Sequence, residues 1–406
     1  MRSPVLADLP LGFEIVVAAV FGAMIGSFLN VCILRWGAEP KQSVVHPRSR
    51  CPRCGRGLAW YDNIPVLSWL ILRARCRGCG EPISVQYPLI ELATAAIWAY
   101  MVWRYGVTLE ALRGALFGTI LLGIAMTDAR EYIIPHEFSL GGTLLAVLFS
   151  AWSDPSLLVP SLQGALVGAG SVLLIGEVSE MAIGQEAMGG GDCALMGMIG
   201  AFLGWEAIVP VLFLGAIIST FLFLLAALWS WRTPPVTPVA VEPEATDPGF
   251  RWRLVLRLVL VGAVPLLFLA LALATGHLNE VLNVLFHALL GAGIAYYVAL
   301  LLPERIARYS WVAVMGLIGA GIAVAAGAGW SLPRLVLGVI IVIAALWFAK
   351  RATLIASPAT AEGLQSQGYL PFGVGLTAAA GLLLLSGSMP LVRQIVEEYG
   401  RLLSYL

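Results

Sequence analysis

Four cysteines in this sequence have the spacing of a metal site. Cys51 and Cys54 form one CxxC pair, and Cys76 and Cys79 form a second pair after 21 intervening residues. Two such pairs supply the four thiolates of a tetrahedral zinc site, and a site closed by four protein ligands is structural. Two redox-active pairs are the alternative, but nothing around these cysteines is typical of a thioredoxin-like unit. We therefore expect a structural Zn²⁺ ion bound by all four cysteines.

Two aspartates stand where apolar segments end, in positions that suit acid–base chemistry. Asp128 follows the apolar run LLGIAMT, and Asp192 ends the glycine run in MGGGD. Two carboxylates at one membrane surface can act as an aspartyl protease, because one activates a water molecule while the other polarises the scissile carbonyl. The neighbouring Gly189, Gly190 and Gly191 would permit close approach of a substrate backbone and unusual φ values.

Simpler interpretations of the two aspartates stay open at this point. Asp128 could be a solvated residue at a helix end, and Asp192 could be the N-cap of a short helix over 193–205. Spacing alone does not choose between these aspartates and the other acidic residues near predicted span ends. Those residues are Glu91, Glu131, Glu137, Glu177, Glu180 and Glu186.

The elements that carry these residues are apolar helices. The chain is 59% hydrophobic and only 12% charged, whereas soluble domains have roughly 25% charged residues. Apolar runs near the length of a membrane-spanning helix recur along it, and the zero net charge does not suggest a nucleic-acid partner. The predicted spans up to residue 230 are 13–34, 86–103, 108–127, 138–152, 157–183 and 206–230, with the short helix 193–205 before the last of these.

A second group of apolar runs follows a linker over 231–250. The fold class predicted from both groups is an all-α polytopic membrane protein of about 11–12 transmembrane helices, with a small four-cysteine zinc domain. The additional spans are 252–275, 281–302, 309–329, 333–349 and 369–388, and an amphipathic tail begins at Pro390.

Charge predicts the orientation of these spans. Between residues 35 and 85, nine lysines and arginines face only three acidic residues. The positive-inside rule places this region, with its four cysteines, in the cytoplasm. Alternating crossings then bring both Asp128 and Asp192 to the cytoplasmic face.

Several segments together resemble the type IV prepilin peptidases, also called prepilin leader peptidase/N-methyltransferases. GSFLNVCILR, residues 26–35, resembles the end of the first span of that family, and residues 51–92 follow its cysteine domain. TDAREYIIP contains its first aspartate, Asp128, and MGGGDCALMG contains its GxGD motif with Asp192. GYLPFGVGLTAAAGLLLLSG resembles its closing span.

The resemblance implies a bacterial inner-membrane enzyme with a GxGD-type intramembrane aspartyl protease architecture and the catalytic residues Asp128 and Asp192. Its substrates would be prepilins or pseudopilins of a type IV pilus or type II secretion system, cut after a glycine that follows a basic leader. S-adenosylmethionine would then methylate the new N-terminus. Methyl transfer is implied by the resemblance alone, because the sequence has no glycine-rich strand–turn–helix, and no residue is predicted to bind this cofactor.

The sequence departs from the family pattern in three places. Ala194 stands where the family usually has lysine, His136 and Glu137 follow Pro135 where an acid or amide is common, and residues 231–367 separate the GxGD motif from the closing span. We interpret the last difference as an insertion of extra spans. The predicted organisation is a first span (1–34), a cysteine domain (35–85), a peptidase core (86–230), the insertion (231–367), and the closing span with its tail (368–406).

A second function class also suits a chain with this many spans. A non-enzymatic scaffold or transporter of a pilus or secretion system would need no catalytic pair. That hypothesis predicts that Asp128 and Asp192 can both be neutralised without loss of function, whereas the peptidase hypothesis predicts that either change abolishes cleavage.

Overall fold

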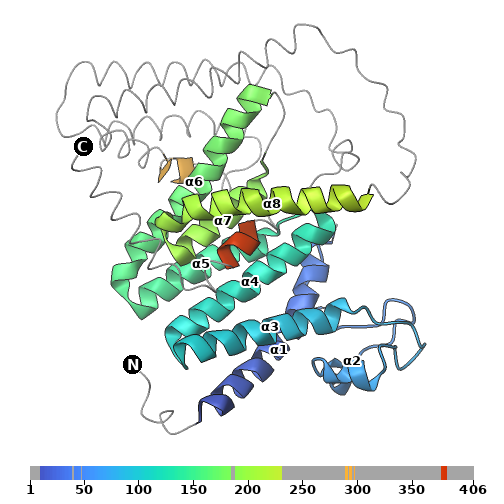
Figure 1. The fold of residues 1–406 in the computed structure, drawn as a ribbon. Helices are drawn as coiled ribbons and strands as arrows, with labels where there is room; N and C mark the ends of the chain where they lie inside the picture. The colour runs from blue at the N-terminus through green and yellow to red at the C-terminus, as the bar shows by residue number, and fades with distance from the viewer. Residues whose placement is uncertain are drawn as a thin grey trace, which may run out of the picture.

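The computed structural model describes residues 10–38, 41–46, 48–183, 188–230, 289–290, 292–294, 297 and 376–381. These residues form a helical bundle with a loop-rich region of the chain, containing the cysteines, beside it (Figure 1). The helices are α1 (Leu11–Trp36), α2 (Leu67–Ile71), α3 (Gln86–Tyr105), α4 (Leu109–Glu131), α5 (His136–Ser153), α6 (Leu158–Ile183), α7 (Gly190–Leu203) and α8 (Ile208–Ser230).

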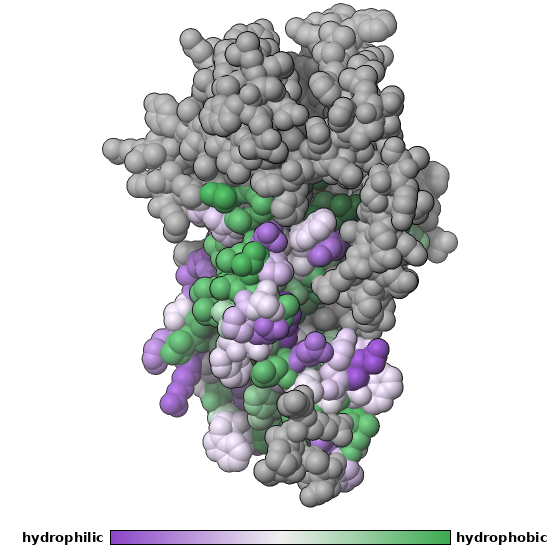
Figure 2. All heavy atoms as spheres, turned by 90° about the vertical axis from the view of Figure 1, so that its left-hand side faces the viewer, coloured by the Kyte–Doolittle hydropathy of each residue, from purple (hydrophilic) through white to green (hydrophobic). Residues whose placement is uncertain are grey.

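Four helical segments within the described residues are long and apolar enough to cross a membrane: α1, α4, Pro155–Gly176 and Trp205–Leu222. Hydrophobic side chains cover much of the described surface in Figure 2, and α1 alone exposes Phe13, Val16 and Val20. Exposed apolar surface of this kind is what a bilayer stabilises. The all-α, multi-pass membrane fold expected from the sequence is therefore confirmed.

Helices α3 and α5 form where spans are predicted, but neither is among those four apolar segments. Both helices contain polar residues that lower their mean hydropathy. The bundle buries several of these polar residues: Glu91, Thr94, Ser139, Thr143 and Ser150. The additional spans predicted between 252 and 349 lie outside the described residues, apart from 289–290, 292–294 and 297.

Glycines bring α1 against α3. A Cβ atom on Gly26 would come within 2.8 Å of the Glu91 Cα atom, and Gly22, one turn earlier, faces α3 in the same way. One turn after Gly26, the Asn30 side chain donates a hydrogen bond to the Tyr87 carbonyl oxygen at 3.2 Å. Small residues let membrane helices approach closely, and the amide then joins them.

The contact between α6 and α7 is closer still, because backbone meets backbone. A Cβ atom on Gly164 would overlap the Gly200 carbonyl group, and one on Gly200 would overlap the Gly164 carbonyl. One turn along, Gly168 faces the Met196 carbonyl in the same way. This face of α7 therefore has no room for an added methyl group.

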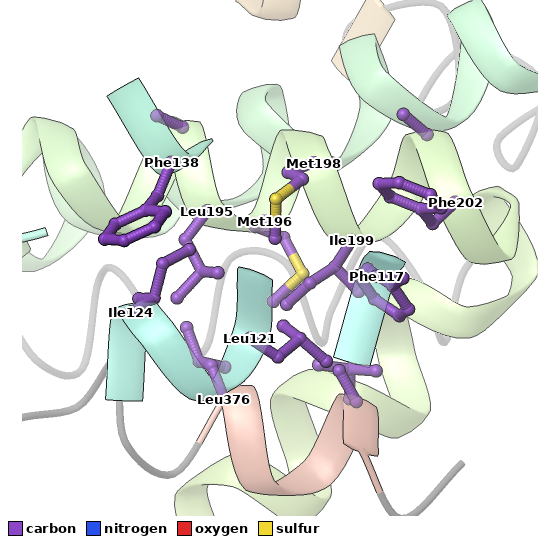
Figure 3. Packing of buried hydrophobic residues seen from close by; sticks show 14 of the residues in the cluster. Phe117, Leu121, Ile124, Phe138, Leu195, Met196, Met198, Ile199, Phe202 and Leu376 are labelled. Atoms are coloured by element: carbon purple, nitrogen blue, oxygen red, sulfur yellow. The ribbon is translucent and has the colours of Figure 1, made fainter. Parts of the chain in front are cut away.

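The opposite side of α7 packs through large side chains. Leu195 and Ile199 point toward α4 in Figure 3, and the Phe202 ring stacks on Phe117 with 4.5 Å between centroids. Helices α4 and α7 therefore contact each other across interlocking apolar side chains rather than through their backbones. The other buried residues labelled in this cluster are Leu121, Ile124, Phe138, Met196, Met198 and Leu376.

The described parts of the inserted and closing segments contact this same bundle. Gly293 lies against the backbone of Leu166 in α6, and Leu376 lies against Gly215 in α8. Leu376 is also fully buried. These residues of the later chain are thus packed into the bundle formed by the earlier helices.

We expect Gly200→Ala to destabilise the bundle, because the new methyl group would have to displace the α6 backbone. Overpacking of this kind costs about 1–3 kcal/mol, and we expect a lower free energy of unfolding in detergent denaturation or a lower melting temperature. Gly141→Ala in α5 is the matched control, because open space surrounds Gly141 and alanine favours a helix. Equal stability of the two variants would contradict the described contact.

Candidate active site and metal centre

The two CxxC pairs adopt the same local structure. In each pair the first cysteine carbonyl accepts a hydrogen bond at 2.9 Å from the N–H of the glycine that follows the pair, Gly55 or Gly80. These glycines have φ of 68° and 73°, a left-handed conformation that side chains disfavour. Two short antiparallel bridges, Arg50 with Gly57 and Arg75 with Pro82, close the turns. The repeated CxxCG sequence thus folds into two equivalent knuckles.

The knuckles bring all four sulfur atoms together. The Sγ atoms of Cys51, Cys54, Cys76 and Cys79 lie within 4.8 Å of one another, and those of Cys51 and Cys79 are 3.8 Å apart. Sulfurs of a tetrahedral zinc site with Zn–S bonds of about 2.3 Å are also about 3.8 Å apart. N–H groups of Cys54 and Arg53 lower the pKa of the Cys51 thiol to about 6, which favours the thiolate form. The donor set therefore suits a thiophilic metal.

The cysteine region has very little apolar core. Within residues 48–85, Cys51 is the one buried residue that contributes apolar core. Polar contacts across the region include the Arg53–Glu81 ion pair between the two knuckles and a 2.8 Å ion pair between Arg77 and Asp62. A metal ion held by the four cysteines could therefore contribute to the shape of this region.

A stripe of residues on α4 leads to the first aspartate. Arg113, Phe117, Leu121, Ile124 and Asp128 follow one another at helical spacings of three or four, which places them on one face. Asp128 lies one turn before the end of α4, and its side chain is only 5% exposed. The interpretation of Asp128 as a solvated helix-end residue is therefore wrong, because α4 continues past it and the bundle covers it.

The second aspartate lies in the first turn of α7. The helix begins at Gly190, its N-cap is Gly189, and the Gly189 N–H donates to the Asp192 Oδ2 atom at 3.4 Å. Asp192 is 7% exposed. The interpretation of Asp192 as the N-cap is therefore wrong, since two more glycines join the helix before it. The unusual φ values that the glycines would permit are not adopted at the described residues 188–191, and Gly189 has φ of −82°.

Contacts at both ends align α4 with α7. The Arg113 Nη2 atom donates to the Phe202 carbonyl oxygen at 2.6 Å, near the start of α4 and the end of α7. Just after the end of α4, the Ile134 side chain lies against Gly191, where a Cβ atom would be 3.0 Å from the Ile134 Cβ. The two helices therefore run antiparallel, and the structure brings both aspartates to the same end of the pair.

The competing acidic residues have other partners where the structure describes them. The Glu91 carboxylate accepts a hydrogen bond from the Val66 N–H at 2.7 Å, which ties α3 to the cysteine region. Burial would raise the pKa of Glu137, but its 2.8 Å ion pair with Lys41 lowers the pKa below the ordinary value. Glu131 is exposed. The side chains of the remaining three lie outside the described residues: Glu177, Glu180 and Glu186.

Of the residues that depart from the family pattern, Ala194 is buried in the bundle and His136 lies at its surface. Ala194, two residues after the GxGD aspartate, is completely buried in the apolar cluster around α7. A lysine there would have to bring its charge through that cluster, and alanine leaves it apolar. His136 begins α5 and is exposed.

Sequence reasoning missed Arg113, whose side chain joins the two aspartate helices. The available signal was a single arginine inside an apolar run, since such residues face the bundle interior and find polar partners. The apolar run around Arg113 could not predict its partner, because the end of α7 lies 89 residues further along the chain. Sequence reasoning also missed the Glu91 contact to Val66, because Val66 lies in a loop with no periodic pattern.

Two family models match this chain, one over the cysteine region and one over the helices that carry the aspartates. A family model described as the bacterial peptidase A24 N-terminal domain matches residues 20–105. The model of the type IV leader peptidase family matches residues 115–224, which include both aspartates. No solved structure matches this chain.

Curated relatives carry a consistent name, prepilin leader peptidase/N-methyltransferase. The relative from Myxococcus xanthus is 39% identical over 255 residues, which cover 60% of this chain and 75% of the relative. The relative from Stutzerimonas stutzeri is 31% identical over 53% of this chain and 82% of its own length. The relative from Klebsiella pneumoniae is 35% identical over 48% of this chain and 87% of its own length. On these matches, the chain belongs to the type IV prepilin peptidase family of aspartic proteases.

Proposed function

We propose that the chain is a prepilin or pseudopilin leader peptidase in which Asp128 and Asp192 are the catalytic pair. The observation that carries this proposal is the placement of two buried carboxylates at one end of antiparallel α4 and α7. Carboxylates close enough to share one proton have pKa values that are pushed apart, so one stays ionised while the other stays protonated.

Such a pair can hydrolyse a peptide bond without any other cofactor. The ionised aspartate takes a proton from water while the water oxygen bonds to the scissile carbonyl carbon, and the protonated aspartate gives its proton to the carbonyl oxygen. The C–N bond then breaks as the leaving amine takes a proton from the aspartate that first accepted one, and the other aspartate takes back a proton from a hydroxyl group of the tetrahedral intermediate, which becomes the new carboxyl group. Each turnover consumes one water and returns both aspartates to their starting states.

The location at a membrane surface suits a substrate with two different halves. The apolar helix of a prepilin would stay in the bilayer, while its basic leader would stay in the water next to it. The basic residues between 35 and 85 support a cytoplasmic position for this end of the bundle in a bacterial inner membrane. Cleavage after a glycine is carried over from the family resemblance.

We also propose that the new N-terminus is methylated, as the name of the matched relatives indicates for them. S-adenosylmethionine would supply the methyl carbon, which bonds the freed amine nitrogen as the carbon–sulfur electron pair stays on sulfur and a proton leaves the nitrogen. The chain itself would have to hold the amine close to this donor on the cytoplasmic side.

The metal proposed for the four-cysteine cluster is zinc with a structural role. Four sulfur donors at tetrahedral separations support it. A closed four-cysteine shell leaves no position for substrate or water, so the ion would stabilise the region between α1 and α3 rather than take part in proteolysis.

We expect Asp128→Asn and Asp192→Asn each to lower the rate of leader cleavage at least about a thousandfold, since the two carboxylates act as a unit. Mass spectrometry of a prepilin-like substrate incubated with purified enzyme would measure the loss. Asp154→Asn is the control. The Asp154 carboxylate accepts a 2.9 Å hydrogen bond from the Ser156 N–H just after α5, at the end of that helix away from the two aspartates. Cleavage by either active-site variant at the rate of the control would favour the scaffold or transporter function instead.

The double variant Cys76→Ser/Cys79→Ser should lose the metal, because two thiolates cannot complete the tetrahedral shell. Elemental analysis should find about one zinc per chain before the change and close to none after it, and limited proteolysis should then cut within residues 48–85. Cys32→Ser is the control, since Cys32 is buried in α1 away from the cluster. Unchanged zinc content in the double variant would refute the site.

A further inference from the structure

A groove separates the cytoplasmic half of α1 from the cysteine region. Its volume is about 530 Å³, within the range of roughly 300–1,000 Å³ that is usual for small-molecule sites. Met24, Phe28 and Val31 on α1 form its apolar wall, and Ile64 and Pro65 close it from the cysteine region. The peptidase mechanism described above uses none of these residues.

The polar side chains of the groove form one cationic end. Arg35 from α1 and Arg48 from the loop before the first knuckle both line it, together with Ser49 and Asn63. The Arg35 Nη1 atom donates to the Ser43 carbonyl oxygen at 2.6 Å, which fixes the loop that carries Arg48. No carboxylate is among the described residues that line the groove.

The carboxyl group of Glu91 lies directly behind the α1 wall of the groove. Ser27 lines the groove, and its hydroxyl group donates to the carboxylate of Glu91 on α3. Glu91 is only 6% exposed, and the Val66 N–H holds its other side. The groove therefore has a cationic end and an apolar wall, and a buried carboxyl group lies behind that wall.

We propose that this groove binds S-adenosylmethionine, and this inference rests on the proposed methyl transfer. The donor set suits that molecule: arginine N–H groups bind its carboxylate, the Asn63 amide can recognise the adenine edge, and the apolar wall accommodates the adenine face. In its ionised form, which the hydrogen bonds from Ser27 and the Val66 N–H favour, Glu91 would offset the positive sulfonium charge.

The groove is separate from the aspartates but joined to them by the chain. Gly37, two residues beyond Arg35, lies beside Thr127, so that a Cβ atom there would be 3.6 Å from the Thr127 methyl group. The following loop reaches the start of α5 through the 2.8 Å ion pair between Lys41 and Glu137. A product N-terminus released near α4 would therefore move along the end of α1 to reach the methyl donor.

Arg48→Gln tests the assignment, because it removes a charge-assisted hydrogen bond to the carboxylate. We expect it to weaken binding of radiolabelled S-adenosylmethionine about tenfold or more, while leader cleavage stays within about twofold of wild type. Arg50→Gln is the matched control, because Arg50 is exposed in the same loop and does not line the groove. Binding is measured at equilibrium in phosphatidylcholine nanodiscs, with melting temperature and zinc content recorded for each variant.

Photo-cross-linking of the bound nucleoside gives an independent readout. We expect the label in peptides covering residues 24–35 and 44–65, and its loss in Arg48→Gln. A label in α6–α8, or equal binding by Arg48→Gln and Arg50→Gln, would overturn the assignment even if the enzyme methylates its product. Wild type that cleaves but binds no methyl donor would instead refute the proposed methyl transfer.

An anionic phospholipid is the other amphiphile that an apolar wall with two arginines could accept. Nanodiscs containing phosphatidylglycerol distinguish it, because a lipid in the groove would displace S-adenosylmethionine from wild type. If Arg48→Gln changes the binding of the lipid and leaves that of S-adenosylmethionine unchanged, the groove is a lipid site and the proposal is wrong.

Discussion

Enclosure of α7 on all sides is the constraint on which the positions of both aspartates depend. Every residue from Asp192 to Phe202 is buried, although the helix is too short to be one of the apolar crossing segments. One face touches the α6 backbone through glycines, and the other meets large side chains of α4. Interiors packed at this density resist sliding or rotation, so the fit of α7 in the bundle determines where Asp192 stands relative to α4.

The two ends of α7 are also matched electrostatically. Asp192 lies in the first turn, where the helix dipole favours a negative charge, and Arg113 reaches the carbonyl oxygens of the last turn, where the dipole favours a positive one. A part-buried guanidinium group needs acceptors, and the unsatisfied carbonyls at a helix end are suitable partners for its Nη2 atom. The same contact keeps α4 and α7 in register.

The sequence predicted the helices well because long apolar runs leave little choice in a membrane. Every predicted span up to residue 230 corresponds to a helix, with bounds that differ by a few residues. The four-cysteine cluster was also predictable, since CxxC spacing is local. Burial of Asp128 was not, because the helix-favouring residues after it extend α4 in a way that an apolar run does not reveal. The pairing of Gly164 with Gly200 could not be predicted either, since glycine spacing does not identify the facing helix.

With the proposed zinc bound, the cysteine region would owe its stability to coordination bonds more than to apolar contacts. Unfolding exposes apolar surface in most domains, and this exposure gives them a large heat capacity change and a curved temperature dependence. Residues 48–85 contain one buried apolar residue, Cys51, so their opening should add little to the heat capacity of the whole protein. Their stability would instead follow the free zinc concentration by mass action. The region between α1 and α3 would then respond to the metal supply of the cell more than to its temperature.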